Sequence, residues 1–362
     1  MAKNNPTTIH LHRSGRKIAL NEPPYIIAEV GTNHNQSKAT AKKMIRKIRE
    51  AGAQCVKFQI YEPNEIVSAR VRATDYGLDH WYGDISAQEM FARYLMTPKD
   101  WFPELKDECH ALGLDFAATI HGPNGLAWCL EEKPDLIKIA SMDHTNLPLL
   151  KSLSGIAPSP ILISFGMAQL DDINAAMDVL GSHPHGAGMF HCVAVYPPRP
   201  DEIMLGKISY YRDQYAVPVG FSDHSDCTEI ALASLGIGAR FFEKHVTIDQ
   251  KQKGPDHPFA LEFPAFAKYV QDLETAFVSI GEKKFEEPSP REFSNRDAYL
   301  KSLIAVKDLI AGDKIKDTDV YIARPGTGIQ PKELDRIAGR RLIRDVAAEV
   351  PLVWEDLEAE PE

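Results

Sequence analysis

The chain has 362 residues, of which 44% are hydrophobic and 25% are charged, and its formal net charge is -10 at pH 7. This length predicts one large domain plus a small one. The negative charge argues against a nucleic-acid partner, and the absence of a long apolar run argues against a membrane partner. A polar N-terminus and five scattered cysteines without a CxxC pair favour a reduced compartment, so we expect a cytoplasmic protein.

Short apolar, β-branched runs alternate along the chain with segments that carry apolar residues at helical spacing. Such runs are typical of strands that are buried on both faces of a parallel sheet. The eight candidates are residues 25–30, 54–60, 114–119, 135–141, 160–164, 188–192, 217–222 and 239–246. Eight strand–helix units in about 250 residues predict an α/β fold of the (β/α)8 barrel type. A doubly wound sheet is the alternative fold.

A charged stretch that contains proline, GEKKFEEPSPREFSNRDA, follows the last expected helix (261–281) and has the composition of a linker. We therefore expect a barrel domain at 1–283, a linker at 284–298 and a small domain at 299–362. The small domain has too few residues for a comfortable core of its own, so it should lean on another surface. A long connection, 61–97, follows the second strand and should lie over the barrel mouth.

Polar side chains gather where the predicted strands end, which in a (β/α)8 barrel is the active-site end. In chain order they are Glu29, Asn33, His34, Lys57, Gln59, Thr119, Lys138, Ser141, Ser164, His191, Ser222, His224, Glu243 and His245. Two lysines among several hydroxyl groups form the kind of donor cluster that a phosphate and a carboxylate require. Taken singly, each lysine could instead snorkel to solvent or pair with Glu29 or Glu243.

Two histidines stand at the ends of the last two predicted strands, which are neighbours in a barrel. His224 and His245 could therefore meet on one divalent cation, and neutral imidazole suits Mn, Fe, Co or Zn better than Mg. Each has a carboxylate beside it, Asp223 or Glu243, which favours a ligand over a core histidine. We interpret His191 as structural.

The motifs IIAEVGTNHN, VKFQ, KIAS followed by NLPLL, HC with YP, VGFSDHS, FFEKHVTID and GPDH occur in this order, and together they resemble the sialic acid synthase family. The match spans essentially the whole chain. Residues 299–362, with KDLIAGDKI and RPGTGI, resemble the C-terminal antifreeze-like (SAF) domain of that family. The resemblance implies a TIM barrel followed by a SAF domain that reaches across a domain-swapped homodimer.

The resemblance also implies a reaction, in which phosphoenolpyruvate condenses with an N-acetylmannosamine-type sugar aldehyde to give a sialic (nonulosonic) acid and phosphate. The implied metal is Mn2+, held by His224 and His245. The residues implied for phosphoenolpyruvate are Lys57, Thr119, Lys138, Ser141, Ser164 and Ser222. Those implied for the sugar are Glu29, Gln59, Tyr196, Asp256 and, from the other subunit, Arg324. The implied catalytic residues are Glu29, Lys57 and Glu243, with the glutamates moving protons.

Two departures from the family pattern fall near the expected mouth: Phe165 where Thr is usual, and Ala194 where Asn or Ser often contacts the substrates. A lost polar contact changes discrimination by roughly one to two orders of magnitude, so the sugar stays open. The alternatives are a legionaminic or pseudaminic acid synthase and another phosphoenolpyruvate-condensing 3-deoxy sugar acid synthase, although no extra basic cluster offers a second phosphate pocket. A non-catalytic carbohydrate-binding homologue is the least favoured hypothesis.

Overall fold

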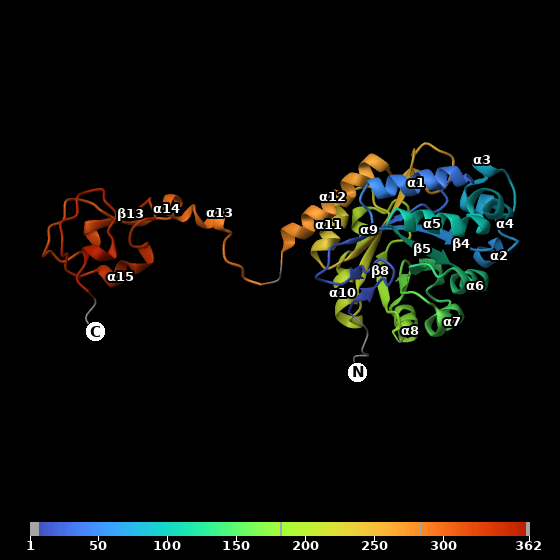
Figure 1. Cartoon of the computed structure of the whole chain (residues 1–362), viewed down its shortest axis with the longest axis horizontal. Helices are drawn as coiled ribbons and strands as arrows, with labels where there is room; N and C mark the ends of the chain where they lie inside the picture. The colour runs from blue at the N-terminus through green and yellow to red at the C-terminus, as the bar shows by residue number, and fades with distance from the viewer. Residues whose placement is uncertain (1–6, 182, 282–283, 360–362) are drawn as a thin grey trace. The chain divides into compact units, whose positions relative to one another are not determined.

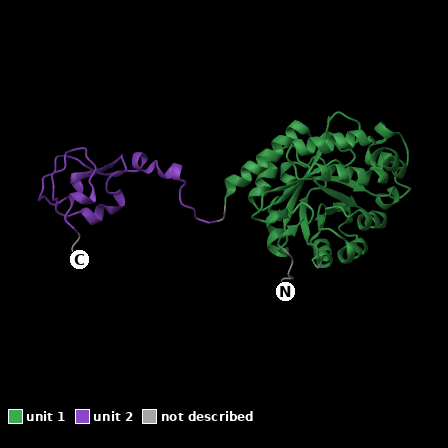
Figure 2. Cartoon of the chain, viewed as in Figure 1, with its two compact units in different colours: residues 1–282 green, residues 283–362 purple. Residues whose placement is uncertain are grey.

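A computed structural model describes residues 7–181, 183–281 and 284–359 of the chain. The chain divides into two compact units, 1–282 and 283–362 (Figure 2). Unit 1 contains all the parallel strands, and unit 2 is a small fold with its own core.

Eight parallel strands close into a barrel in unit 1 (Figure 1). They are β3 (Tyr25–Glu29), β4 (Cys55–Ile60), β5 (Asp115–Ile120), β6 (Leu136–Ile139), β7 (Ile161–Ser164), β8 (Ala187–Cys192), β9 (Val219–Asp223) and β10 (Phe241–Thr247). Because β10 pairs with both β9 and β3, the predicted barrel is confirmed and the doubly wound alternative is wrong. Predicted and observed strand ends differ by at most two residues. A short strand, β11 (Leu261–Glu262), extends the edge of β10.

Helices surround the barrel (Figure 1). They are α1 (Lys38–Glu50), α5 (Phe102–Ala111), α6 (Pro123–Glu132), α7 (Leu147–Ile156), α8 (Leu170–Leu180), α9 (Pro200–Ile203), α10 (Gly206–Tyr215), α11 (Thr228–Gly236) and α12 (Phe263–Ile280). Helix α1 shows why such segments form: the Ser37 side chain accepts from the Thr40 N–H, and Met44, Ile45 and Ile48 share one buried face. These faces pack on the outer side chains of the strands and form the main core.

The long connection after β4 folds into α2 (Pro63–Ile66), η1 (Ala73–Tyr76), α3 (Asp79–Tyr82), α4 (Ala87–Met90) and η2 (Phe91–Leu95), and η3 (Lys99–Trp101) follows it. A small cluster around Ala73, Met90 and Leu95 holds it together. In the loop after β10, Lys253 lies over the Tyr82 ring, 4.6 Å from its centroid. The connection therefore contacts a loop at the carboxyl end of the barrel.

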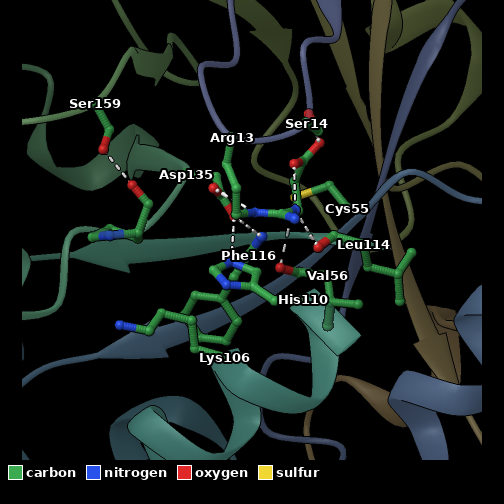
Figure 3. A network of polar contacts seen from close by, with 12 residues as sticks. Arg13, Ser14, Cys55, Val56, Lys106, His110, Leu114, Phe116, Asp135 and Ser159 are labelled. Carbon is green, nitrogen blue, oxygen red and sulfur yellow. Dashed lines mark hydrogen bonds and ion pairs between the residues drawn. The ribbon is translucent and has the colours of Figure 1, made fainter. Parts of the chain in front are cut away.

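An N-terminal hairpin closes the opposite end of the barrel. Its strands, β1 (Ile9–His10) and β2 (Lys17–Ile18), are antiparallel, and Ile9 and Ile18 join the cluster of inward-facing barrel side chains. Between them Arg13 lies 2.8 Å from Asp115 and 3.0 Å from Asp135, the second pair being visible in Figure 3. Because apolar side chains fill this end, a site inside the barrel must open at the carboxyl end.

Unit 2 contains α13 (Pro290–Phe293), α14 (Arg296–Tyr299), β12 (Ser302–Ala305), η6 (Asp317–Asp319), β13 (Val320–Ala323), η7 (Pro331–Glu333), α15 (Leu334–Ile337) and η8 (Trp354–Asp356). Strands β12 and β13 are antiparallel, and Leu303 and Ile337 lie in a separate apolar core. The predicted linker, 284–298, contains α13, and the Gly326 N–H donates to the Asp297 carbonyl. The end of that stretch thus packs with unit 2.

The cysteines and the helix lengths are two further features of the fold. All five cysteines are free thiols, so no disulfide braces the fold. Within the described ranges, no helix has both the length and the apolar character that crossing a bilayer requires.

Candidate active site

Four charged side chains meet inside the carboxyl end of the barrel. The Lys57 ammonium lies 2.7 Å from Oε2 of Glu29 and 3.6 Å from Oε2 of Glu243. The Lys138 ammonium lies 3.2 and 3.1 Å from the two carboxylate oxygens of Glu243. All four residues are buried. They come from β3, β4, β6 and β10, on each of which alternate residues face the interior.

Burial and ion pairing act in opposite directions on the pKa of each of these four groups. Burial raises the pKa of Glu29, and the attraction of Lys57 only partly offsets it. Burial also acts to raise the pKa of Glu243, but Lys138 and Lys57 together outweigh it and the pKa falls. Burial lowers the pKa of Lys138, whereas for Lys57 the two carboxylates outweigh burial and raise the pKa. Glu29 is therefore the carboxyl suited to hold a proton, and Glu243 is the one suited to stay ionised.

Hydroxyl groups surround the two lysines. The Lys57 ammonium donates to Oγ1 of Thr119 at 2.8 Å, and the Ser222 hydroxyl donates to Glu243 at 3.2 Å. The Ser164 hydroxyl is buried and has no hydrogen-bond partner among the described residues. A buried polar atom of this kind marks a place where a ligand oxygen can bind. The structure thus brings together the residues that were expected to hold phosphoenolpyruvate.

The two departures from the family pattern lie in different places. The Phe165 ring is buried in the core between strands and helices, 6.0 Å from the His144 ring. In contrast, a Cβ built on Gly166 would lie 3.2 Å from Cβ of Ala194 and 2.7 Å from Oγ of Ser141. Ser141 also accepts from the Gly166 N–H at 3.0 Å. Ala194 therefore borders the site, whereas Phe165, directly after β7, belongs to the core that lies outside the barrel strands.

The two predicted ligand histidines lie side by side, with ring centroids 5.4 Å apart, and both are buried. Nδ1 of His224 faces the Val193 carbonyl at 3.2 Å, which leaves its Nε2 for another partner. Nδ1 of His245 has no hydrogen-bond partner among the described residues and lies 3.6 Å from Asp256. Burial and the neighbouring His224 hold the pKa of His245 well below its ordinary value, so this ring is neutral at pH 7.

This pair fits a divalent cation of the kind that accepts imidazole ligands, such as Mn, Fe, Co or Zn. The buried, unpartnered nitrogen of His245 is the observation that supports the fit. In the part of the chain that the structure describes, no group of three or more His, Cys, Asp or Glu side chains forms a complete metal site. The protein would therefore supply two imidazoles and leave the remaining coordination positions to water or substrate.

The predicted sugar residues of unit 1 line the same opening. The Tyr196 ring is half-exposed, and its centroid lies 4.4 Å from that of the His224 ring. A Cβ built on Gly31 would lie 2.8 Å from Asp256, 3.3 Å from Glu29 and 3.6 Å from Gln59, so these three polar groups share one wall. Gln59 donates to Glu29 at 2.7 Å. Burial raises the pKa of Asp256.

Comparison with known proteins agrees with this geometry. Residues 44–285 match the NeuB family, and residues 301–358 match the SAF domain. The chain belongs to the NeuB family. The resemblance to sialic acid synthases with a SAF domain is thereby confirmed, and the protein is an enzyme of this synthase type.

Relatives of this NeuB-family chain carry different product names. The N,N'-diacetyllegionaminic acid synthase of Legionella pneumophila is 30% identical over 92% of this chain and 95% of its own length. The N-acetylneuraminate-9-phosphate synthase of Drosophila melanogaster is 28% identical over 91% of this chain and 94% of its own length. A crystal structure of the N-acetylneuraminic acid (sialic acid) synthetase of Leptospira borgpetersenii, in complex with citrate, has a TM-score of 0.69 and 28% identity, and covers 80% of this chain and 94% of that one. Family membership therefore leaves the sugar open.

One predicted sugar residue of the NeuB-family chain belongs to unit 2. Arg324 follows β13, and its guanidinium lies 5.0 Å over the Tyr299 ring. Its expected contact with a sugar in another subunit stays a prediction.

Two buried residues of the site were not predicted from the sequence. Tyr61 and His121 come two positions after the predicted site residues Gln59 and Thr119. Both are buried, at 4% and 5% exposure, and Nδ1 of His121 lies 2.7 Å from Oδ2 of Asp143. The signal was present in the sequence, because each missed residue follows a predicted site residue by two positions and so faces the same side of its strand.

Proposed function

We propose that this NeuB-family enzyme condenses phosphoenolpyruvate with an open-chain, N-acetylmannosamine-type sugar aldehyde, giving a nonulosonic acid and inorganic phosphate. The observation that carries the proposal is the pair of buried ammonium groups, Lys57 and Lys138, at the same end of the barrel as the buried, unpartnered hydroxyl of Ser164. Such a cluster suits a small ligand that carries both a phosphate and a carboxylate.

The glutamates have a clear part in binding such a ligand. In the free protein, Glu29 and Glu243 neutralise Lys57 and Lys138. When phosphoenolpyruvate brings its own anionic groups to the two lysines, one glutamate must lose its partner or take up a proton. Glu29 is the better proton acceptor, because its pKa is already raised by burial.

The proposed reaction forms a bond from C3 of phosphoenolpyruvate to the aldehyde carbon, after which water adds at C2 and cleavage of the C2–O bond releases phosphate. Glu29 would deliver a proton to the oxygen that was the aldehyde oxygen, and the ionised Glu243 would take one from the attacking water. Lys57 and Lys138 would stabilise the anionic groups throughout. His224 and His245 would hold a divalent cation, for which we propose Mn2+, and which supplies Lewis-acid polarisation of the aldehyde when it is bound.

A neutral aldehyde is favoured over a phosphorylated one. The N-terminus of α6 could bind a phosphate, but the Glu65 carboxylate already accepts from the Asn124 N–H there at 2.8 Å. A legionaminic- or pseudaminic-type sugar is the nearest alternative, and the name of the Legionella pneumophila relative supports it. A non-catalytic carbohydrate-binding role ranks lower, because Glu29, Lys57 and Glu243 are assembled in one cluster.

Two further parts of the proposal concern the assembly and the location of the enzyme, and the first of them rests on the family resemblance alone. We propose a domain-swapped homodimer, in which Arg324 of one copy reaches the sugar site of the other. We also propose that the enzyme works in the cytoplasm, which its five free thiols suit.

Phosphate release by the purified protein tests the proposal directly. Phosphoenolpyruvate and Mn2+ are offered with N-acetylmannosamine, di-acetamido 6-deoxy sugars and arabinose 5-phosphate, and His224→Ala serves as the control. Release with one sugar, lost in the variant, is the expected result and identifies the aldehyde. Silence across the panel, with the metal bound, would favour the carbohydrate-binding role.

A further inference from the structure

Two side chains extend the inward-facing rows of β4 and β5 beyond the site described above. Tyr61, directly after β4, continues the alternate positions of Lys57 and Gln59, and His121, directly after β5, continues that of Thr119. The Tyr61 and His121 rings are nearly perpendicular, at 78°, and their centroids are 5.7 Å apart. The two rings therefore form one patch, closer to the barrel mouth than the lysines.

Each ring keeps one buried polar atom without a hydrogen-bond partner among the described residues, namely Oη of Tyr61 and Nε2 of His121. Leaving such atoms unpaired costs free energy, so two of them on neighbouring rings indicate that something else completes them. Burial and the charge of Asp256 raise the pKa of Tyr61, so its phenol keeps its proton and can donate it.

Asp143 determines which kind of atom His121 offers. This buried residue lies in η4 (Ser141–Asp143), directly after β6, and its Oδ2 is 2.7 Å from Nδ1 of His121. Because a carboxylate only accepts, Nδ1 of His121 donates to Asp143, and in the neutral tautomer that this contact selects the lone pair is on Nε2. The patch thus presents one donor, from Tyr61, and one acceptor, from His121.

We propose that Tyr61 and His121 bind one hydroxyl group of the sugar aldehyde, with Tyr61 donating to it and His121 accepting from it. A hydroxyl satisfies both atoms because it accepts and donates, whereas a phosphate oxygen would only accept and would face the lone pair of Nε2. Asp143 is a positioning residue that acts through His121. The inference rests on the proposed condensation and narrows its substrate to a neutral, polyhydroxylated aldehyde.

Steady-state kinetics of the full-length protein with Mn2+ and phosphoenolpyruvate test this assignment. Tyr61→Phe removes only the unpartnered hydroxyl, and we expect the KM for the sugar to rise about fivefold or more while the KM for phosphoenolpyruvate stays within about twofold. The melting temperature should not fall, since no bond within the protein is lost. His121→Phe should act in the same direction. The matched control is Tyr211→Phe, a buried tyrosine of α10 in the outer core, which should leave both KM values unchanged.

A double-variant comparison separates positioning from a merely structural role of Asp143. Asp143→Asn should raise the sugar KM less than His121→Phe does, and the double variant should be no weaker than His121→Phe alone, because both changes act through one ring. Sugar analogues that each lack one hydroxyl then locate the contact. For the analogue that lacks the hydroxyl bound by Tyr61, wild type and Tyr61→Phe should have the same KM for the sugar, because neither can form that contact.

The inference and the proposed function can fail separately. If Tyr61→Phe and His121→Phe leave the sugar KM unchanged in an active enzyme, the inference is wrong and water completes the two atoms. If wild type releases no phosphate with any aldehyde, calorimetry with the unreactive sugar alcohol of N-acetylmannosamine decides the matter. Binding that Tyr61→Phe weakens would support the inference and overturn the condensation, whereas absence of binding to wild type would overturn both.

Discussion

The Lys138 ammonium lies 3.1 Å from Oε2 of Glu243, and the two residues reach each other from opposite sides of the barrel. Three strands separate β6 from β10 in either direction around the closed sheet. The ion pair therefore crosses the barrel interior, where both side chains are buried. Because a buried charge that loses its partner is strongly destabilising, the pair is a sensitive point for both stability and activity.

Lys138→Met should therefore abolish phosphate release and also destabilise the fold. The change leaves the buried Glu243 carboxylate with Lys57 at 3.6 Å as its remaining cationic partner, and we expect the free energy of unfolding to fall by about 3 kcal/mol. Urea unfolding measures the second effect. Lys268→Met is the control, because Lys268 forms an exposed ion pair with Asp272 on α12 and its loss should barely change stability. An equally stable Lys138→Met protein would contradict the account.

Metal removal should abolish activity, and added Mn2+ should restore it. His224→Ala and His245→Ala should each weaken Mn2+ binding measured by calorimetry by tenfold or more, which is about 1.4 kcal/mol, because each would remove one of the two ligands that we propose. His191→Gln is the matched control, since this buried histidine lies on β8 with its ring stacked on Phe221. Full Mn2+ affinity in His224→Ala would show that the metal binds elsewhere.

Ala194 and Phe165 should respond differently to reintroduced hydroxyls. Ala194→Ser adds a hydroxyl beside Ser141, and we expect it to lower the KM for phosphoenolpyruvate about threefold. Phe165→Thr should leave that KM unchanged and lower the free energy of unfolding by about 3 kcal/mol, because it empties a core position. Kinetics and urea unfolding of both variants check the contrast. A change in substrate discrimination in Phe165→Thr would show that its ring does influence the site.

Acid should weaken the closed end of the barrel through Asp135. Its burial acts to raise the pKa, but His110, the Phe116 N–H and Arg13 outweigh it, so the pKa of Asp135 is lowered in the folded protein. A depressed carboxyl contributes stability above its unfolded pKa of about 3.9, and this contribution is lost as the pH falls through the folded value. Asp135→Asn should thus be less stable than wild type at pH 6, and the difference should shrink below about pH 4. A difference independent of pH would contradict the assignment.

The alternation of residues along each strand made the barrel and most of its site predictable from sequence. Apolar runs identified all eight strands, and the polar residues at their ends included Glu29, Lys57, Lys138 and Glu243. Such patterns are local, because the side of a strand that a residue faces depends only on its position in the run. The strand-end positions of His224 and His245 also indicated a metal site, whereas the choice of Mn2+ and the role of Arg324 came from the family resemblance, and these roles stay predictions.

Only the tertiary structure decided which of these groups face each other. The pairing of Lys138 with Glu243 across the barrel, the burial of Phe165 in the outer core and the unpaired atoms of Tyr61 and His121 all depend on residues that are distant in sequence. The physical reason is that a hydrogen bond or an ion pair needs two groups at short distance, and closure of the sheet is what brings groups from distant strands together. Sequence periodicity specifies which side of its strand each side chain faces. Closure of the sheet determines whether that side chain meets a hydrogen-bond or ion-pair partner.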